Sequence, residues 1–314
     1  MRRRGIVSFT SATRKCSSLR PRRRVKMPRG MKRISHRCFG VAALLALVVI
    51  ATCGAGRVVI PFTIDPATIA VPRDARSLSN HEAAVRGLTA ILVRELGLPM
   101  PATFTLYVYG GRQPFEHGLV HDAQVAPSRA AELSEFAVGI GKRRQLLLND
   151  DGAQPRGREW LRLIAHELAH VSQIEMAQGE GRAEQWLAEG MAEWVAFTSL
   201  ERLGLDTLAN RRGLATAGIR NHAALVAAKL DLETLGNPRG FTVRHLKEGS
   251  LPTYQLAFLM ADYLIERDGF PRVVDYFKSF ERRQDRHSNF RDIFGQSLDQ
   301  FEREVLAHLK TVVR

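Results

Sequence analysis

No cysteine occurs after position 53 of this 314-residue chain, and no aspartate or glutamate occurs in its first 37 residues. The three cysteines are Cys16, Cys38 and Cys53. Residues 54–314 therefore cannot form an internal disulfide, and they must be stabilised by their hydrophobic core and by any bound metal. The chain also lacks internal repeats, and its length suits one large domain or two small ones.

Positive charge gathers in the same part of the chain that lacks acidic residues. Residues 1–37 hold 14 of the 46 lysines and arginines, whereas residues 38–314 hold 32 basic and 32 acidic residues. The formal net charge of +14 thus comes from a basic N-terminal arm, and the remainder is formally neutral. Because the remainder is neutral and the arm precedes an apolar segment that predicts export, described next, we expect no nucleic-acid partner.

An apolar stretch without charge, Cys38–Gly56, follows the arm. Its 19 residues lie between a signal-peptide core and a short membrane-spanning helix in length. A cleaved signal, an uncleaved membrane anchor and lipidation at Cys53 remain open, whereas the preceding basic residues disfavour a buried core helix. Each open alternative predicts export to the cell envelope, since basic residues stay on the cytoplasmic side. A translation start at Met27 or Met31 would leave much of the arm out.

The rest of the chain predicts an α+β fold. Residues 57–80 are rich in proline and predict a linker with one strand, followed by a domain at 81–314. Alternation of apolar residues predicts a strand at Thr103–Tyr109 and a hairpin of Phe136–Ile140 with Gln145–Leu148. Helical periodicity predicts a helix after Asn80 and a mostly helical C-terminal part, with helices near 160–176, 184–203, 208–229, 254–268, 271–280, 290–294 and 298–313. Strands early and helices late favour a small N-terminal mixed sheet followed by helices.

One predicted helix carries the motif His166-Glu167-Leu-Ala-His170. Residues four apart share a helical face, so both imidazoles can bind one cation. Glu167 can then reach a water bound to that cation without ligating it, and zinc lowers the pKa of such a water to about 7. The bland alternative is an exposed face with two solvated histidines, but apolar residues flank the motif on nearly all sides. A buried polar group of this kind requires a partner.

A second cluster supplies the carboxylate that such a site needs. Glu189 follows His170 after 18 residues, on the next predicted helix, and is the candidate third ligand. Glu193 lies one turn later and could orient a ligand histidine through its free ring nitrogen. A solvated acidic stripe is the alternative, which Trp186 and Trp194 beside these residues disfavour.

Together, the His166–His170 motif, the 18-residue gap and Trp186-Leu-Ala-Glu189-Gly resemble the gluzincin zinc metallopeptidases. These form the thermolysin-like MA clan, and the resemblance is greatest to the branch of leucyl-type aminopeptidases and leukotriene A4 hydrolase. It implies a zincin-like catalytic domain with an active-site helix pair and bound Zn²⁺. By this resemblance His166, His170 and Glu189 would hold the metal, and Glu167 would be the general base.

The resemblance extends, more weakly, to the segment that begins at Leu251. That segment is similar to the family's tyrosine-bearing helix and implies that Tyr254 donates a hydrogen bond to the oxyanion. An ordinary tyrosine at a helix start is the alternative. The G-x-M-E-N segment that anchors a free amino group in the aminopeptidase branch is missing. Endopeptidase activity is therefore favoured, with Phe136–Gly141 as an edge strand for an extended peptide.

Other histidines were weighed against this site. His117 and His121 are also four residues apart, but Gly118 weakens a helix there. No cluster of carboxylates follows that could supply a third metal ligand to this pair. Isolated histidines such as His245 are assigned to the surface or the core. The sequence thus predicts an exported zinc metallopeptidase acting on peptides or proteins. The alternative is a catalytically inactive zincin-like binding or structural module at the envelope.

Overall fold

The computed structural model describes residues 56–152 and 156–314. Within these ranges one four-stranded sheet has the strand order β1-β2-β4-β3. Its strands are β1 (Arg57–Thr63), β2 (Thr103–Tyr109), β3 (Gly139–Lys142) and β4 (Gln145–Asn149). β2 runs antiparallel to β1 and parallel to β4, and β3 pairs antiparallel with β4. β3 is therefore one edge of a mixed sheet.

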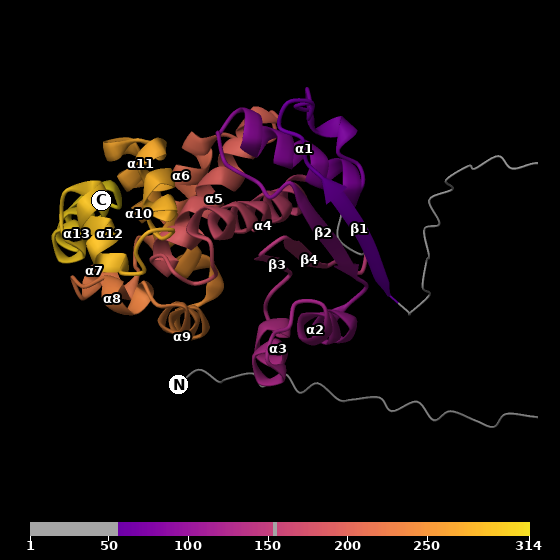
Figure 1. Ribbon diagram of the computed structural model, residues 1–314. Helices are drawn as coiled ribbons and strands as arrows, with labels where there is room; N and C mark the ends of the chain where they lie inside the picture. The colour runs from indigo at the N-terminus through magenta and orange to yellow at the C-terminus, as the bar shows by residue number, and fades with distance from the viewer. Residues whose placement is uncertain (1–55, 153–155) are drawn as a thin grey trace, which may run out of the picture. The chain divides into compact units, whose positions relative to one another are not determined.

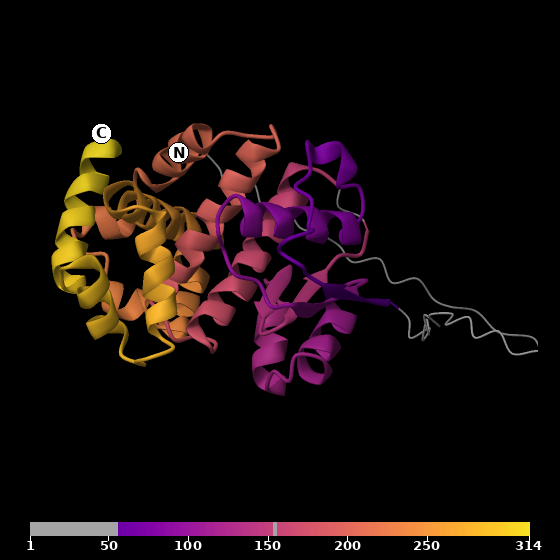
Figure 2. The same cartoon turned by 45° about the horizontal axis from the view of Figure 1, so that its top comes forward.

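Helices cover both faces of this sheet (Figures 1 and 2). These helices are α1 (His81–Arg94), α2 (Arg112–His121), α3 (Pro127–Ser134) and α4 (Arg158–Ala177). On the face of α1 and α4, Leu106, Leu146 and Leu148 join the main hydrophobic core. On the face of α2 and α3, Tyr109 and Leu147 belong to a smaller core. Successive strand residues point to opposite faces, so one run of apolar residues serves both cores.

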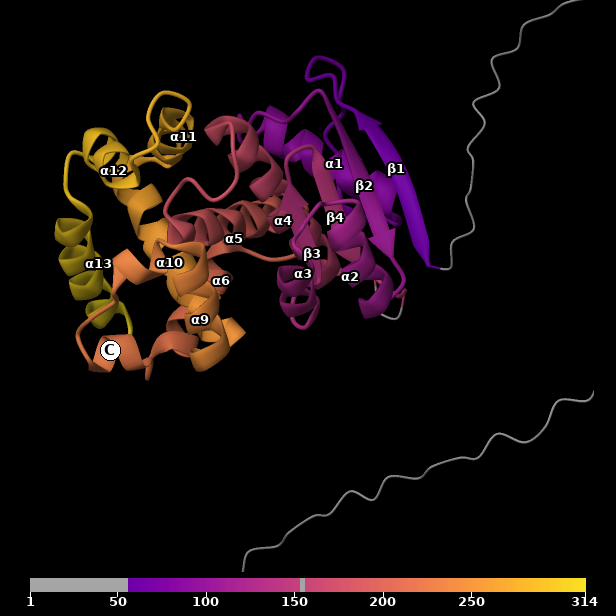
Figure 3. The same cartoon turned by 60° about the horizontal axis from the view of Figure 1, so that its bottom comes forward.

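The C-terminal part is helical, and α4 lies between it and the sheet (Figure 3). Its helices are α5 (Gln185–Arg202), α6 (Leu208–Ile219), α7 (Ala223–Val226), α8 (Leu232–Leu235), α9 (Pro238–Glu248), α10 (Ser250–Asp268), α11 (Phe270–Ser279), α12 (Arg286–Phe294) and α13 (Leu298–Val312). α5 and α10 meet at Gly190, where an added Cβ would lie only 2.2 Å from the carbonyl oxygen of Ala257. This close contact draws the turn of α10 that carries Tyr254 towards Glu189.

The predicted α+β class is confirmed, but the first strand of the predicted hairpin lies at Gly139–Lys142 and not at Phe136–Ile140. Two interpretations of the sequence also change. Residues 57–80 contain the expected strand, but Phe62 and Leu78 are buried in the main core, so the segment packs as part of the domain. The region around Gly118 forms helix α2 although glycine weakens helices. A Cβ at Gly118 would lie 2.2 Å from the ring of Tyr109, so the glycine is needed where α2 packs on β2.

The predicted signal or anchor at 38–56 and the basic arm at 1–37 lie outside the described residues, apart from Gly56. Across 56–152 and 156–314, none of the helices combines the length and the hydrophobicity needed to cross a membrane.

Candidate metal centre

The candidate site lies on the helical hairpin formed by α4 and α5. His166 and Glu167 of α4 are 6% and 7% exposed, in a helix whose other buried residues are mostly apolar. Glu189 and Glu193, one turn apart on α5, are equally buried. Burying so many ionisable groups in one interface is costly unless they bind one another or a cation. The buried charges of the two helices must therefore be paired with one another or with a bound cation.

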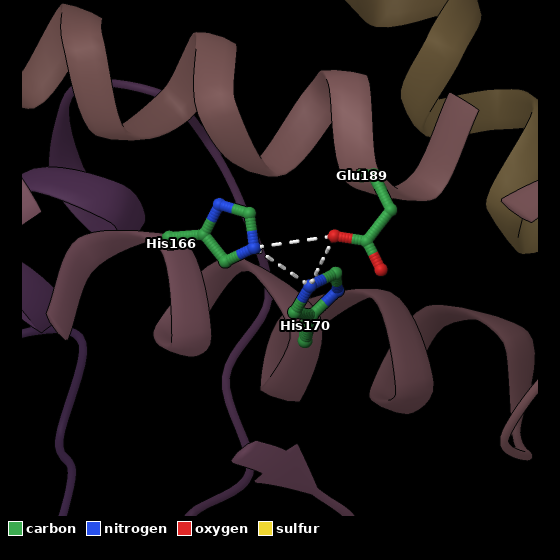
Figure 4. A group of neighbouring side chains, drawn as sticks. All are labelled: His166, His170 and Glu189. Atoms are coloured by element: carbon green, nitrogen blue, oxygen red, sulfur yellow. Dashed lines mark hydrogen bonds and ion pairs between the residues drawn. The ribbon is translucent and has the colours of Figure 1, made fainter. Parts of the chain in front are cut away.

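Three side chains of the hairpin converge on one point (Figure 4). The Nε2 atoms of His166 and His170 lie 3.1 Å apart. Oε2 of Glu189 lies 3.3 Å from Nε2 of His166 and 3.4 Å from Nε2 of His170. Among the described residues, this is the one cluster of at least three His, Cys, Asp or Glu side chains with metal-binding geometry. The three predicted ligands are thus brought together.

The dimensions of this triangle fit a zinc ion. Ligands about 2.0–2.1 Å from a tetrahedral zinc are separated by roughly 3.4 Å, close to the three observed separations. Oε2 of Glu189 is buried without a hydrogen-bond partner, although it faces both rings. A cation between the three atoms would satisfy this oxygen, and two imidazoles with one carboxylate suit zinc. All three side chains also line the larger cavity described below.

Glu193 lies behind His166, as predicted for an orienting residue. Its Oε1 is 3.2 Å from Nδ1 of His166, the ring nitrogen that faces away from the other ligands. The same oxygen accepts a hydrogen bond of 2.6 Å from Arg162, which sequence analysis did not single out. Arg162 precedes His166 by one helical turn, so helical spacing was the signal that could have found it.

The electrostatic field of the hairpin favours a positive charge at this point. Burial by itself would lower the pKa of His166, but Glu189, Glu193 and Glu167 outweigh it and raise that pKa to about 10. Burial would raise the pKa of Glu189, but His170 and His166 hold it well below its usual range. The carboxylates that favour a proton on the rings would equally favour a metal ion in its place.

Glu167 points to the edge strand rather than into the triangle. Its Oε2 accepts a hydrogen bond of 2.8 Å from the backbone N–H of Gly141 on β3. An added Cβ on Gly139 would lie 2.8 Å from Cγ of Glu167, and one on Gly141 would lie 2.3 Å from the backbone oxygen of Glu167. The two glycines therefore let β3 approach α4 closely enough to hold this carboxylate beside the ligands.

Two cavities flank the site along α4. Both are lined by Gly139, His166, Glu167 and Tyr254. The larger, of about 460 Å³, extends along the C-terminal half of α4 as far as Ala177. The smaller, of about 360 Å³, extends along its N-terminal turns to Glu159 and Arg162 and has mostly apolar walls towards α6 and α10. All three candidate ligands line the larger cavity, whereas only His166 of the three lines the smaller one, and we refer to the two cavities together as the cleft.

Tyr254 faces the site from α10, as its predicted role requires. Its ring centroid is 6.0 Å from that of His166. Burial, reinforced by the carboxylates of Glu189 and Glu167, raises the pKa of Tyr254 well above its usual value, so the phenol stays protonated and can donate a hydrogen bond.

His245, which the sequence predicts to lie at the surface or in the core, also lines both cavities. The centroid of its ring lies 5.8 Å from that of Tyr254 and 4.8 Å from that of Phe136. Helix α9 therefore borders the cleft at this point. No local pattern around His245 signalled this position, because α9 returns to the cleft only through the tertiary fold.

The rival pair His117 and His121 does form one face of α2, with ring centroids 4.0 Å apart. Both side chains are exposed, and neither belongs to the cluster with metal-binding geometry.

Two glutamines that sequence analysis did not single out also contact the candidate ligands. Gln173 forms a hydrogen bond with His170, and Gln185 forms one with Glu189.

Comparison with known proteins bears on the same part of the chain. The family of the eCIS core domain matches residues 109–178, and this family is a zincin-like domain related to peptidases. The matched segment runs from the end of β2 to the end of α4, so it includes His166, Glu167 and His170 but stops before Glu189. It covers well under half of the chain and shows no specific gluzincin family. Neither the curated proteins nor the solved structures contain a match.

Proposed function

We propose that this protein is a zinc-dependent metallopeptidase that cleaves peptide bonds within a peptide or protein chain. The observation that carries the proposal is the convergence of His166, His170 and Glu189 at 3.1–3.4 Å, with Glu167 beside them in a cleft. The zincin-like character of the matched family supports the same chemistry.

The proposed roles follow from where each group lies. A bound zinc ion would supply Lewis acidity, which polarises a carbonyl and acidifies water. Glu167 takes a proton from the attacking water and returns it to the leaving amine nitrogen, so the peptide bond and one water become an acid and an amine. Tyr254, kept protonated, donates a hydrogen bond to the carbonyl oxygen as negative charge develops there. Glu193, which accepts a hydrogen bond from Arg162, lies against Nδ1 of His166 and favours the ring orientation that aims Nε2 at the metal.

The shape of the cleft supports an endopeptidase. An extended peptide would pair with the outer edge of β3, as strands added to a sheet edge do. Because cavities lie on both sides of the ligands, residues before and after the cleaved bond would both have room. The missing amino-group anchor in the sequence agrees with this.

We also propose that residues 38–56 direct the domain to the cell envelope. Fractionation of cells that express a tagged chain would test this localisation.

The test uses the full-length chain in which Cys16, Cys38 and Cys53 are replaced by serine, so that no thiol binds the metal. Metal analysis is combined with digestion of a peptide library, with and without a chelator. We expect one zinc per chain, cleavage that the chelator stops, and a loss of about 10²–10⁴-fold in rate for Glu167→Gln with zinc retained. A protein that holds zinc but cleaves nothing would instead favour the inactive binding module. A protein that holds no zinc would refute both assignments.

A further inference from the structure

Beyond the ligands themselves, the hairpin holds two buried or half-buried glutamines that contact them. We infer that Gln173 and Gln185 are positioning residues for the metal, which orient His170 and Glu189. This inference rests on the proposed zinc site and extends it to residues that have no part in the chemistry. Each ligand then has its own polar partner from the same two helices.

Gln173 fixes the ring of His170 through the tautomer. Its side chain is 4% exposed, and its Nε2 donates a hydrogen bond of 2.8 Å to the backbone oxygen of Ala188. A carbonyl oxygen only accepts, so the amide must turn its Oε1 towards Nδ1 of His170, 2.9 Å away. Nδ1 then carries the proton, and the lone pair of Nε2 is left to face the metal.

The same amide ties the two ligand helices together. Gln173 lies on α4, three residues after His170, whereas Ala188 lies on α5, directly before Glu189. One side chain therefore sets both the ring of one ligand and the backbone next to another. Burying an amide costs free energy that an apolar side chain of the same size would not cost. The two hydrogen bonds of Gln173 offset this cost, which indicates a role beyond packing.

Gln185 acts on the third ligand. Gln185 is the first residue of α5, and its Nε2 donates a hydrogen bond of 2.7 Å to Oε1 of Glu189. The carboxylate is thereby turned so that Oε2, which has no hydrogen-bond partner, points at the two rings. Oε1 and Oε2 thus have separate roles, one for the protein and one for the metal.

The test measures zinc affinity by competition with a chromophoric chelator, in the full-length chain without cysteines. Gln173→Met keeps the volume and removes both hydrogen bonds, and Gln185→Met removes the contact with Glu189. We expect each variant to bind zinc about 10–100-fold more weakly. Gln173→Glu keeps an acceptor for Nδ1–H and should recover part of the loss. Gln178→Asn, at an exposed amide whose Nε2 donates to the backbone oxygen of Glu175, is the control and should match the parent.

A second readout separates positioning from folding. The absorption spectrum of the cobalt-substituted protein reports ligand geometry, and we expect it to change in Gln173→Met but not in Gln178→Asn. Thermal unfolding of the metal-free proteins should stay within a few degrees of the parent. Zinc affinities within twofold of the parent and an unchanged cobalt spectrum would overturn this inference, whereas a parent that binds no zinc would overturn the proposed function itself.

Discussion

The carboxylate of Glu167 accepts a hydrogen bond of 2.8 Å from the backbone N–H of Gly141, which joins helix α4 to the edge strand. The contact links two features that the proposed chemistry uses together, a base on α4 and a strand edge that binds substrate. It exists because Gly139 and Gly141 leave room for α4, and this can be tested directly.

Alanine at the two glycines should have different effects. A Cβ at Gly141 would meet backbone of α4 at 2.3 Å, which cannot move alone, so Gly141→Ala should lower the free energy of unfolding by about 1–3 kcal/mol. The three atoms nearest to a Cβ at Gly139 all belong to the side chain of Glu167, so Gly139→Ala should shift the carboxylate and lower kcat by up to about 10²-fold with little loss of stability. Denaturant titration and peptide hydrolysis distinguish the two, and equal effects on both measurements would contradict this account.

The two glutamates of α5 should differ in what their loss does to the metal. Glu189→Ala removes a proposed ligand, so zinc should no longer be retained through gel filtration. Glu193→Gln leaves all three ligands and should weaken zinc binding by about 10–100-fold, because Nδ1 of His166 loses the charge of its partner. The measurement is zinc content together with the dissociation constant. Glu189→Ala protein that binds zinc as tightly as the parent would refute the ligand assignment.

Tyr254→Phe should lower kcat and leave both KM and zinc affinity near the parent values. The phenol is proposed to stabilise charge that develops only in the transition state, and loss of one such donor costs about 10²–10³ in rate. Tyr263→Phe is the matched control on the same helix, because its hydroxyl donates to Glu304 away from the cleft. If both variants lose activity equally, Tyr254 acts through packing and not as a donor.

A buried carboxylate outside the site should make stability depend on pH. Burial raises the pKa of Glu184 to about 7, against the opposing effect of Arg286, while an unfolded glutamate titrates near 4.5. Between these values the folded state binds the extra proton, so the free energy of unfolding falls as pH rises from about 4.5 to 7 and is then constant. Glu184→Gln should therefore lose less stability than the parent between pH 5 and pH 8 in denaturant titrations.

The control for this prediction is Glu233→Gln. Glu233 contacts the same Arg286, but its side chain is 66% exposed, so its removal should change the pH dependence far less. An identical fall in stability for the parent and Glu184→Gln would show that this carboxyl is ionised in the folded protein throughout the range.

Local spacing was enough to predict the parts of the fold and site that depend on one element. The four-residue interval of His166 and His170 is a property of the helix itself, and the bulky apolar neighbours of Glu189 indicated that it is buried. The structure brings these three together, although metal binding stays a prediction. The strand at Thr103–Tyr109 was likewise predicted with its observed bounds, because alternation of apolar residues is local.

What the sequence did not reveal depends on contacts between distant elements. Helix α2 was missed because Gly118 was interpreted by its own helix propensity, whereas the ring of Tyr109 decides which residue fits there. His245 reaches the cleft only because α9 folds back across it. Gln173 and Arg162 lie one turn from ligand histidines, so their spacing was visible, but an amide or a guanidinium on a helix face carries no signal of its own partner.

The three proposed ligands and their polar partners all come from residues 162–193, a single pair of neighbouring helices. The edge strand and Tyr254, by contrast, arrive from elsewhere in the chain. The proposed ion binding is therefore a local property of a short segment, whereas the proposed catalysis requires the assembled domain. Substitutions in the strand or in α10 would then abolish the proposed activity and leave the proposed ion binding intact.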